Sequence, residues 1–176
     1  MNTSAIIVGL QQLLRPYQIP YYVTAADEIM EKVELNVFPV AVITNTRKST
    51  HAGDHWTAFF IISRTKAEWF CSFGAALRDY PEIQFPTKQI KIVKQNCNAL
   101  QGEDTNTCGL WSMKFIHERA QGHSYEEFLA QFGSNRKYND WKIINWSRRA
   151  IQFQNPQKTF HFAINYVLVS VMSLRH

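Results

Sequence analysis

The sequence contains few of the residues that are typical of several classes of protein. Only seven of its 176 residues are Gly and six are Pro, which excludes a collagen-like or low-complexity chain. Charged residues are also scarce, at 19%, whereas 45% of the residues are hydrophobic and 14% are aromatic. Disordered chains show the opposite balance, with few aromatic residues and a large charge imbalance. Length and composition therefore predict one folded domain over residues 1–176, large enough to bury a core.

Long apolar runs and a secretion signal are missing as well. The apolar stretch near the N-terminus has no basic residue before it and no small-residue cleavage site after it, so we expect no signal peptide. A second run, residues 160–174, is interrupted by His161 and Asn165 and is shorter than the ~20 residues of a membrane span. It predicts a buried strand or a core helix. Neither secretion nor a membrane partner is expected.

Cysteine occurs only three times, at Cys71, Cys97 and Cys108. An odd number of cysteines without a signal peptide indicates free thiols and a reducing compartment. Cys108 stands out because the polar residues 101–107 lead to it and a hydrophobic helix is predicted to begin with it. Unpaired N–H groups and the helix dipole would lower the pKa of a thiol there and can bind an oxyanion. The alternative is a buried structural cysteine.

Two further residues suit chemistry at Cys108. Gly109 would leave space beside the thiol for a substrate carbonyl. His55 lies at the start of an apolar segment, directly after Gly53 and Asp54, where it is placed to take the thiol proton. An ordinary capping or exposed histidine is the alternative for His55.

Hydrophobic patterning predicts helices packed against a small mixed or antiparallel sheet, an α+β fold. The predicted strands are residues 38–44, 55–63, 68–72 and 89–94. The predicted helices are residues 4–14, a buried helix from Cys108 to Gly122, and a short helix that opens with a capping box at Ser124 and Glu127. In this arrangement the buried helix would carry a nucleophile at its N-terminus.

The net charge of +5 is confined to residues 134–158. This segment holds six basic residues and one acid, Asp140, while the rest of the chain has 13 of each sign. Four aromatic residues are interleaved with the basic ones, namely Tyr138, Trp141, Trp146 and Phe153. Because basic residues contact phosphates and aromatic rings stack on bases, one interpretation is a nucleic-acid surface. Its candidate contacts are Arg136, Lys137, Lys142, Arg148 and Arg149. The other interpretation is an amphipathic helix with Trp141, Ile144 and Ile151 packed inward.

Four sequence blocks follow one another between residues 38 and 117. They are AVITNT (41–46), GDHWTAF (53–59), FCSFG (70–74) and residues 100–111, in which Gln101 precedes Cys108 by seven residues. In order and spacing these blocks resemble the adenovirus protease (adenain) family of cysteine endopeptidases, which is related to the ubiquitin-like-protein proteases. The blocks define a motif-bearing core at residues 38–122. The basic and aromatic helical region predicted at residues 134–176 shows no convincing match to the family, and neither do the first 35 residues.

The resemblance implies a role for each of five residues. Cys108 matches the nucleophile, His55 the general base, and Gln101 the side-chain donor of the oxyanion hole, with the Cys108 backbone N–H as its companion. Trp56 matches the aromatic residue beside the histidine, and Gly109 the glycine after the nucleophile. Relatives cleave polypeptides after small residues such as Gly. The resemblance thus implies a viral or virus-derived enzyme that matures capsid or core precursors in the virion or in the host nucleus or cytoplasm.

One residue departs from the family pattern. The third triad position, an Asp or Glu in the family, is Cys71, which is a weak hydrogen-bond partner. Strand alternation turns Glu68 away from it and Asp54 is badly placed, which leaves a water molecule or Asp79 to orient His55. Three interpretations stay open: an active dyad or water-completed triad, a weakened enzyme kept for binding, and an enzyme gated by a disulfide between Cys71 and Cys108.

Activators and partners follow from the same resemblance. Adenovirus proteases are stimulated by DNA and by a short peptide, the latter partly through a disulfide. Cys97 lies only four residues before Gln101, too close to match that cysteine, so no covalent peptide activator is expected. Stimulation by DNA stays open, and neither a cofactor nor a metal is required. The alternatives are a protease that removes a ubiquitin-like modifier ending in Gly-Gly and a non-catalytic protein that binds DNA or capsid.

Overall fold

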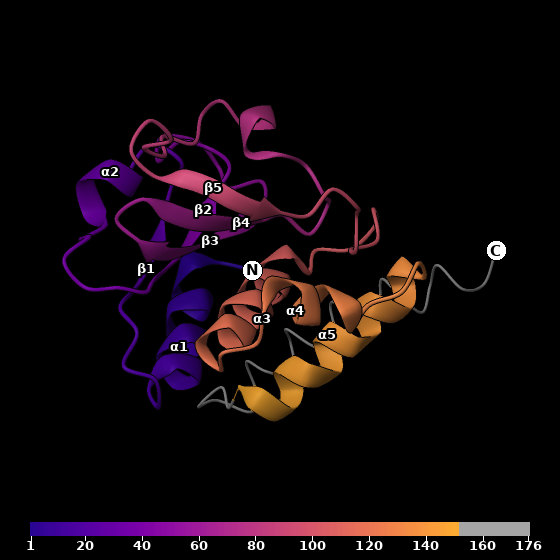
Figure 1. Cartoon of the computed structure of the whole chain (residues 1–176). Helices are drawn as coiled ribbons and strands as arrows, with labels where there is room; N and C mark the ends of the chain where they lie inside the picture. The colour runs from indigo at the N-terminus through magenta and orange to yellow at the C-terminus, as the bar shows by residue number, and fades with distance from the viewer. Residues whose placement is uncertain (152–176) are drawn as a thin grey trace.

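A five-stranded mixed sheet forms one layer of the computed structural model, which describes residues 1–151 (Figure 1). Its strands, in their order across the sheet, are β1 Tyr21–Thr24, β2 Val40–Asn45, β3 Trp56–Ser63, β4 Lys66–Phe70 and β5 Lys91–Gln95. The two outer pairs are parallel and the two inner pairs are antiparallel. The predicted buried element at residues 160–174 lies outside the described residues, as do Phe153 and Lys158 of the basic segment.

The four strands predicted from hydrophobic patterning are confirmed, with ends displaced by one or two residues. Strand β5 alternates between exposed and half-buried residues, as a strand at the edge of a sheet should. Strand β1 was not predicted. It has only four residues, of which three are half-buried, so no alternating pattern is long enough to reveal it.

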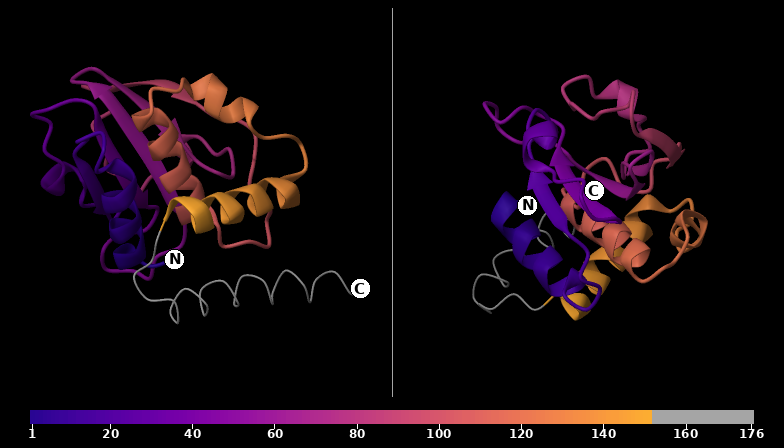
Figure 2. Two further views of the ribbon diagram at one scale, coloured as in Figure 1. Left: turned by 90° about the horizontal axis from the view of Figure 1, so that it is seen from below. Right: turned by 60° about the vertical axis from the view of Figure 1, so that its left-hand side comes forward.

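In the described part of the chain, four helices cover one face of the sheet (Figure 1). They are α1 Thr3–Leu14, α3 Cys108–Ala120, α4 Tyr125–Ala130 and α5 Arg136–Ala150. The short helix α2 Ile29–Lys32 and the 3₁₀ turn η1 Leu77–Asp79 contribute to the hydrophobic cluster on the other face. Helix α5 lies against α3 on the side away from the sheet (Figure 2). The fold is therefore of the α+β class.

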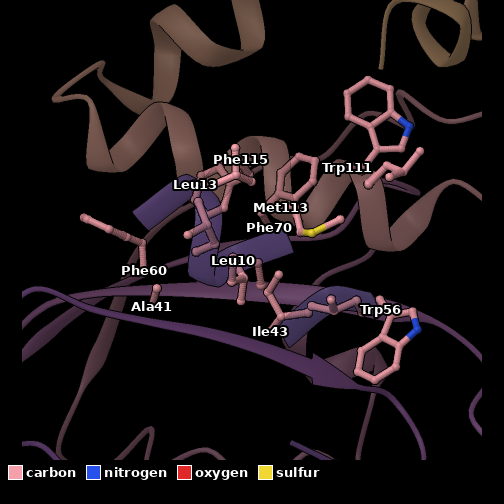
Figure 3. Packing of buried hydrophobic residues seen from close by; sticks show 14 of the residues in the cluster. Leu10, Leu13, Ala41, Ile43, Trp56, Phe60, Phe70, Trp111, Met113 and Phe115 are labelled. Atoms are coloured by element: carbon pink, nitrogen blue, oxygen red, sulfur yellow. The ribbon is translucent and has the colours of Figure 1, made fainter. Parts of the chain in front are cut away.

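The core lies on both faces of the sheet because side chains of β3 alternate between them. Phe60 packs toward the helices, whereas Phe59 and Ile61 pack on the opposite side. On the helical side, Leu10 of α1 and Phe115 of α3 belong to the same buried cluster (Figure 3). Burying each such side chain contributes about 1.5–3 kcal/mol. This packing holds α3 against β3, so that the first residues of both elements lie close together.

Helix α3 is the buried helix that the sequence predicts. Trp111 and Phe115 are fully buried, and the helix ends before Gly122, whose positive φ of 89° favours glycine. The capping box that follows is also confirmed. Ser124 Oγ accepts a hydrogen bond from the Glu127 N–H at 3.1 Å, and Glu127 Oε2 accepts one from the Ser124 N–H at 2.6 Å.

The inward face of α5 matches the amphipathic interpretation only in part. As predicted, Ile151 is buried and Ile144 packs against the core, but Trp141 is 57% exposed. The buried face also carries Asn139, Asp140, Ile143 and Ser147. Two polar residues occupy the start of this face because they hold the loop before α3. That requirement fixes the rotation of α5 and leaves Trp141 in solvent.

Candidate active site

His55 lies directly before β3, and its backbone is held by the preceding loop. Asn45 Oδ1 accepts hydrogen bonds from the backbone N–H groups of Arg47, at 3.0 Å, and Asp54, at 3.2 Å. The Thr46 N–H donates to the His55 carbonyl at 2.9 Å. These contacts close the loop on itself and deliver the imidazole, which is buried, to the end of the sheet.

Cys71 follows β4 directly and contacts the His55 ring. Because the antiparallel register pairs Ala58 with Phe70, the residue before β3 lies near the residue after β4. The Cys71 sulfur is 3.4 Å from His55 Nε2. The backbone of Cys71 is clamped by the buried side chain of Asn96, which accepts from the Cys71 N–H at 3.2 Å and donates to its carbonyl at 2.6 Å. The residue that the sequence predicts at the third triad position is therefore a buried thiol in contact with the histidine.

Two aromatic rings complete the surroundings of His55. Phe73 stacks on the imidazole with ring centroids 4.7 Å apart, and Tyr80 lies nearly parallel to it at 6.1 Å. The Tyr80 hydroxyl is 3.4 Å from the Cys71 sulfur. Neither Tyr80 nor Asn96 was singled out from the sequence, since a loop tyrosine and a loop asparagine carry no local signal of such contacts.

The three carboxylates considered for orienting His55 are engaged elsewhere. Glu68 lies on the helical side of the sheet and pairs with Arg119 at 2.6 Å, as strand alternation predicts. Asp54 pairs loosely with Arg47 at 3.7 Å. Asp79, which the sequence left as a candidate, instead accepts a hydrogen bond from the Ala76 N–H at 2.8 Å. No acid among residues 1–151 makes a hydrogen bond to His55.

Cys108 is the first residue of α3 and is buried next to the start of β3. The backbone N–H of Trp56, the residue after His55, lies close enough to the Cys108 sulfur to favour its thiolate form. The Ser112 hydroxyl fastens this turn of α3 to β3 by donating to the Trp56 carbonyl at 3.2 Å. Cys108 and His55 are thus brought to one place, although the described residues show no direct hydrogen bond between them.

Burial keeps both groups neutral at rest. It lowers the pKa of His55 from 6.5 to about 4, although Asp54 acts in the opposite direction. Burial also raises the pKa of the Cys108 thiol. The expectation of a lowered thiol pKa is therefore wrong in its net direction. The Trp56, Gly109 and Cys108 N–H groups and the positive N-terminus do favour the thiolate, but desolvation is larger.

Gln101 is buried, and its side chain bridges two segments. Its Oε1 accepts from the Ser72 hydroxyl at 2.6 Å, and its Nε2 donates to the Thr105 carbonyl at 2.6 Å. The Ser72 carbonyl in turn accepts from the backbone N–H groups of Leu100 and Gln101, at 2.8 and 3.1 Å. Adjacent residues thus hold the two predicted groups, Cys71 contacting His55 and Ser72 contacting Gln101.

Asp140 organises the loop that leads into α3. Its Oδ2 accepts from the Gly102 N–H at 2.8 Å and from the Thr105 hydroxyl at 3.0 Å. Its Oδ1 accepts from the Thr107 hydroxyl at 2.6 Å and from Trp111 Nε1 at 2.8 Å. The carboxylate is buried and receives four hydrogen bonds from residues 102–111. Sequence reasoning missed this role, although Asp140 is the one acid in the basic segment.

Met1 lies beside Trp56 and Gly109, the other two residues to which the resemblance assigns a role. The Trp56 indole N–H donates to the Met1 carbonyl at 3.1 Å. A Cβ atom added at Gly109 would lie 3.0 Å from Met1 Sδ and 3.5 Å from Ile6 Cδ1. The space that Gly109 leaves is therefore filled by the start of the chain and by α1, and does not lie open to a substrate carbonyl.

The basic segment presents an exposed aromatic pair. The rings of Tyr138 and Trp141 are stacked, with centroids 5.4 Å apart and an interplanar angle of 11°, and the Lys142 ammonium lies 5.0 Å from the Tyr138 ring centroid. Arg136 pairs with Glu103 at 3.1 Å. The other predicted contacts, Lys137, Arg148 and Arg149, are exposed on the same helix.

Residues 1–151 contain no cluster of three or more His, Cys, Asp or Glu side chains that could hold a metal ion. Over the same residues, no helix combines the length and apolarity needed to cross a bilayer. All three cysteines are free thiols, Cys97 being exposed and the other two buried.

No protein-family model matches the sequence, and no curated protein matches it either.

Proposed function

We propose that the protein is a cysteine endopeptidase with Cys108 as its nucleophile and His55 as its general base. The observation that carries this proposal is the convergence of the four sequence blocks on one end of the sheet. There His55 contacts Cys71, Cys108 lies beside the backbone N–H of Trp56, and Ser72 holds Gln101. A nucleophile, a base and an oriented amide donor at one site suit acyl transfer.

The proposed reaction starts from a neutral pair. As the thiol attacks the substrate carbonyl, its proton passes to the free nitrogen of His55, and a tetrahedral oxyanion forms. The Cys108 backbone N–H and the Gln101 side chain would stabilise that oxyanion. His55 then gives its proton to the leaving amine, and a thioester remains on Cys108. Water, deprotonated by His55, hydrolyses the thioester and regenerates the thiol.

The substrate class rests on the family resemblance. It favours precursor or structural proteins of a virus or virus-derived element, cleaved after a small residue such as Gly. A protease that removes a ubiquitin-like modifier is the alternative within enzymes. A catalytically weakened protein that retains the fold for binding is the alternative outside them.

A thiol-reactive peptide tests the proposal. A peptide that ends in glycine and carries a vinyl methyl ester should modify Cys108, as located by mass spectrometry, and His55→Ala should abolish the adduct. Cys97→Ala is the matched control, because the exposed Cys97 thiol accounts for non-specific labelling. A folded protein that reacts only at Cys97 would refute the enzyme and favour the binding protein. Probes built on a ubiquitin-like modifier would identify the deconjugating alternative.

A second function, binding of single-stranded nucleic acid, is favoured by one specific observation. Tyr138 and Trp141 form a stacked and exposed pair among basic residues of α5. Stacking of one base on such a platform contributes about 1–3 kcal/mol, so Trp141→Ala should weaken binding of a labelled DNA 20-mer at least about fivefold. Removing Arg148 should lower the slope of log affinity against log salt by about 1. Lys88→Ala, an exposed lysine remote in sequence, is the charge control.

A further inference from the structure

The Cys71 sulfur lies between two hydrogen-bonding partners, and the donor in one of these hydrogen bonds limits which atom can be the donor in the other. It is 3.4 Å from His55 Nε2 and 3.4 Å from the Tyr80 hydroxyl. A thiol has one hydrogen and weak acceptor capacity. If the S–H points to Tyr80, the sulfur can accept only from a protonated Nε2. If the S–H points to His55, Nε2 must be unprotonated, and the ring proton then sits on Nδ1.

The position of Cys108 decides which of these tautomers is productive. Nδ1 is the ring nitrogen nearer the His55 backbone, and the Cys108 sulfur lies at the backbone N–H of the next residue, Trp56. Nε2 is occupied by Cys71. Nδ1 is therefore the nitrogen available to take the Cys108 proton, which requires the hydrogen to be on Nε2.

We propose that Tyr80 is a positioning residue that selects this tautomer: its hydroxyl oxygen accepts the Cys71 S–H, which turns a sulfur lone pair toward the Nε2–H of His55. The tyrosine and the thiol together thus replace the acid of the family pattern. No charged group is needed. When Nδ1 takes the proton from Cys108, the Nε2–H to sulfur bond is unchanged.

The surroundings of Tyr80 suit this role. Its side chain is half-buried, and either atom of the contact with Cys71 can be the donor, so the hydroxyl oxygen is able to accept the Cys71 S–H. Burial raises the pKa of Tyr80, which keeps the hydroxyl protonated through the neutral range. Gly74 makes the turn that brings the chain back to this point. Its φ is 72°, and a Cβ there would lie 2.5 Å from the Asn98 carbonyl carbon, which favours glycine.

The tautomer of His55 can be measured directly, independently of peptide cleavage. In protein labelled with ¹⁵N-histidine, the ring nitrogen shifts of His55, assigned with His55→Ala, should show the hydrogen on Nε2. Tyr80→Phe keeps the ring but removes the acceptor, and should move the population toward the Nδ1–H form. Tyr138→Phe, an exposed tyrosine on α5, should leave the tautomer unchanged.

The kinetic consequence rests on the proposed function. Tyr80→Phe should slow Cys108 labelling by the glycine peptide about fivefold, which corresponds to one net neutral hydrogen bond. Cys71→Asp supplies an acceptor that needs no tyrosine, so in that background Tyr80→Phe should change neither the tautomer nor the labelling rate. If Tyr80→Phe fails to fold, Cys71→Ala tests the same link, because it removes the sulfur that joins Tyr80 to Nε2 and should likewise move the His55 hydrogen toward Nδ1; an unchanged tautomer in folded Cys71→Ala would also overturn the inference.

Two outcomes with Tyr80→Phe would overturn the inference. One is an unchanged His55 tautomer in folded Tyr80→Phe; the other is an equal effect of Tyr80→Phe with Cys71 and with Asp at position 71. Failure of the proposed function would look different. The tautomer would respond as expected, while neither cleavage nor labelling at Cys108 would occur.

Discussion

Replacing Asp140 by asparagine should uncouple α5 from the candidate site while preserving the shape of the side chain. Two of the four donors are hydroxyls, on Thr105 and Thr107, which can rotate to become acceptors. The other two are N–H groups that cannot, one on each carboxylate oxygen: Gly102 N–H on Oδ2 and Trp111 Nε1–H on Oδ1. Whichever oxygen becomes NH₂, one buried N–H therefore faces another donor.

The expected loss in the free energy of unfolding follows from that one unpaired N–H group. A hydrogen bond to a charged group is worth about 1.5–3 kcal/mol, and a buried donor left unpaired costs a similar amount. Asp140→Asn should therefore lower the free energy of unfolding by about 2–4 kcal/mol, measured by urea denaturation with tryptophan fluorescence. Because the same loop carries Gln101 and leads into Cys108, displacing it by about 1 Å should also slow Cys108 labelling about 100-fold.

The control for this prediction is Asp104→Asn, which changes an exposed acid in the same loop. It should alter the free energy of unfolding by less than about 0.5 kcal/mol and leave the labelling rate unchanged. If Asp140→Asn matches the wild type in both measurements, the four hydrogen bonds do not hold the site and the reasoning fails.

Three further outcomes are expected. His55 has a folded pKa of about 4 against 6.5 unfolded, so the unfolded state binds more protons between these values and the protein loses stability as the pH falls from 6.5 to 4. Urea denaturation at pH 7 and pH 4 should show this loss reduced in His55→Gln by up to about 3 kcal/mol, and an identical loss in wild type and variant would show that His55 is not buried neutral. Ser72→Ala removes the 2.6 Å hydrogen bond to Gln101 and should lower kcat for peptide cleavage about 10-fold, with KM nearly unchanged. A change confined to KM would contradict a role of Gln101 in the oxyanion hole. Cys71 contacts Nε2 of His55, whereas Cys108 lies beside the Trp56 N–H, so we expect no disulfide between them. Air-oxidised Cys97→Ala protein should therefore cleave a peptide equally with and without reductant. Recovery of cleavage activity on reduction would instead support the disulfide-gated interpretation.

Elements with a strong local pattern were predictable from the sequence. Strand β3 is a continuous apolar run, and α3 combines apolar spacing with a glycine stop, so neighbours along the chain reveal both. The capping box at Ser124 depends on residues only three apart. Strand β1 escaped prediction because four residues show no period, and the rotation of α5 escaped it because the buried side of that helix carries Asn139 and Asp140.

The contacts that organise the candidate site join residues that are far apart in the sequence. Asn96 reaches Cys71 across 25 positions, and Asp140 reaches Gly102 across 38. A polar residue in a loop or a basic helix looks the same in the sequence whether it is exposed or buried with four donors. The direction of the Cys108 pKa shift depends in the same way on distant parts of the chain, since Trp56 and Met1 lie beside it only in the folded protein.

The α+β class, most of the strands, the helix that begins at Cys108 and the order of the four blocks follow from the sequence alone, because each is encoded in residues close together along the chain. Contacts between distant segments, by contrast, bring Tyr80 to Cys71, let Asp140 hold the loop before α3, and bury His55 and Cys108 in their neutral forms. These features arise where segments far apart in the chain exclude water together. Their desolvation and hydrogen-bond partners do not exist until the chain has folded.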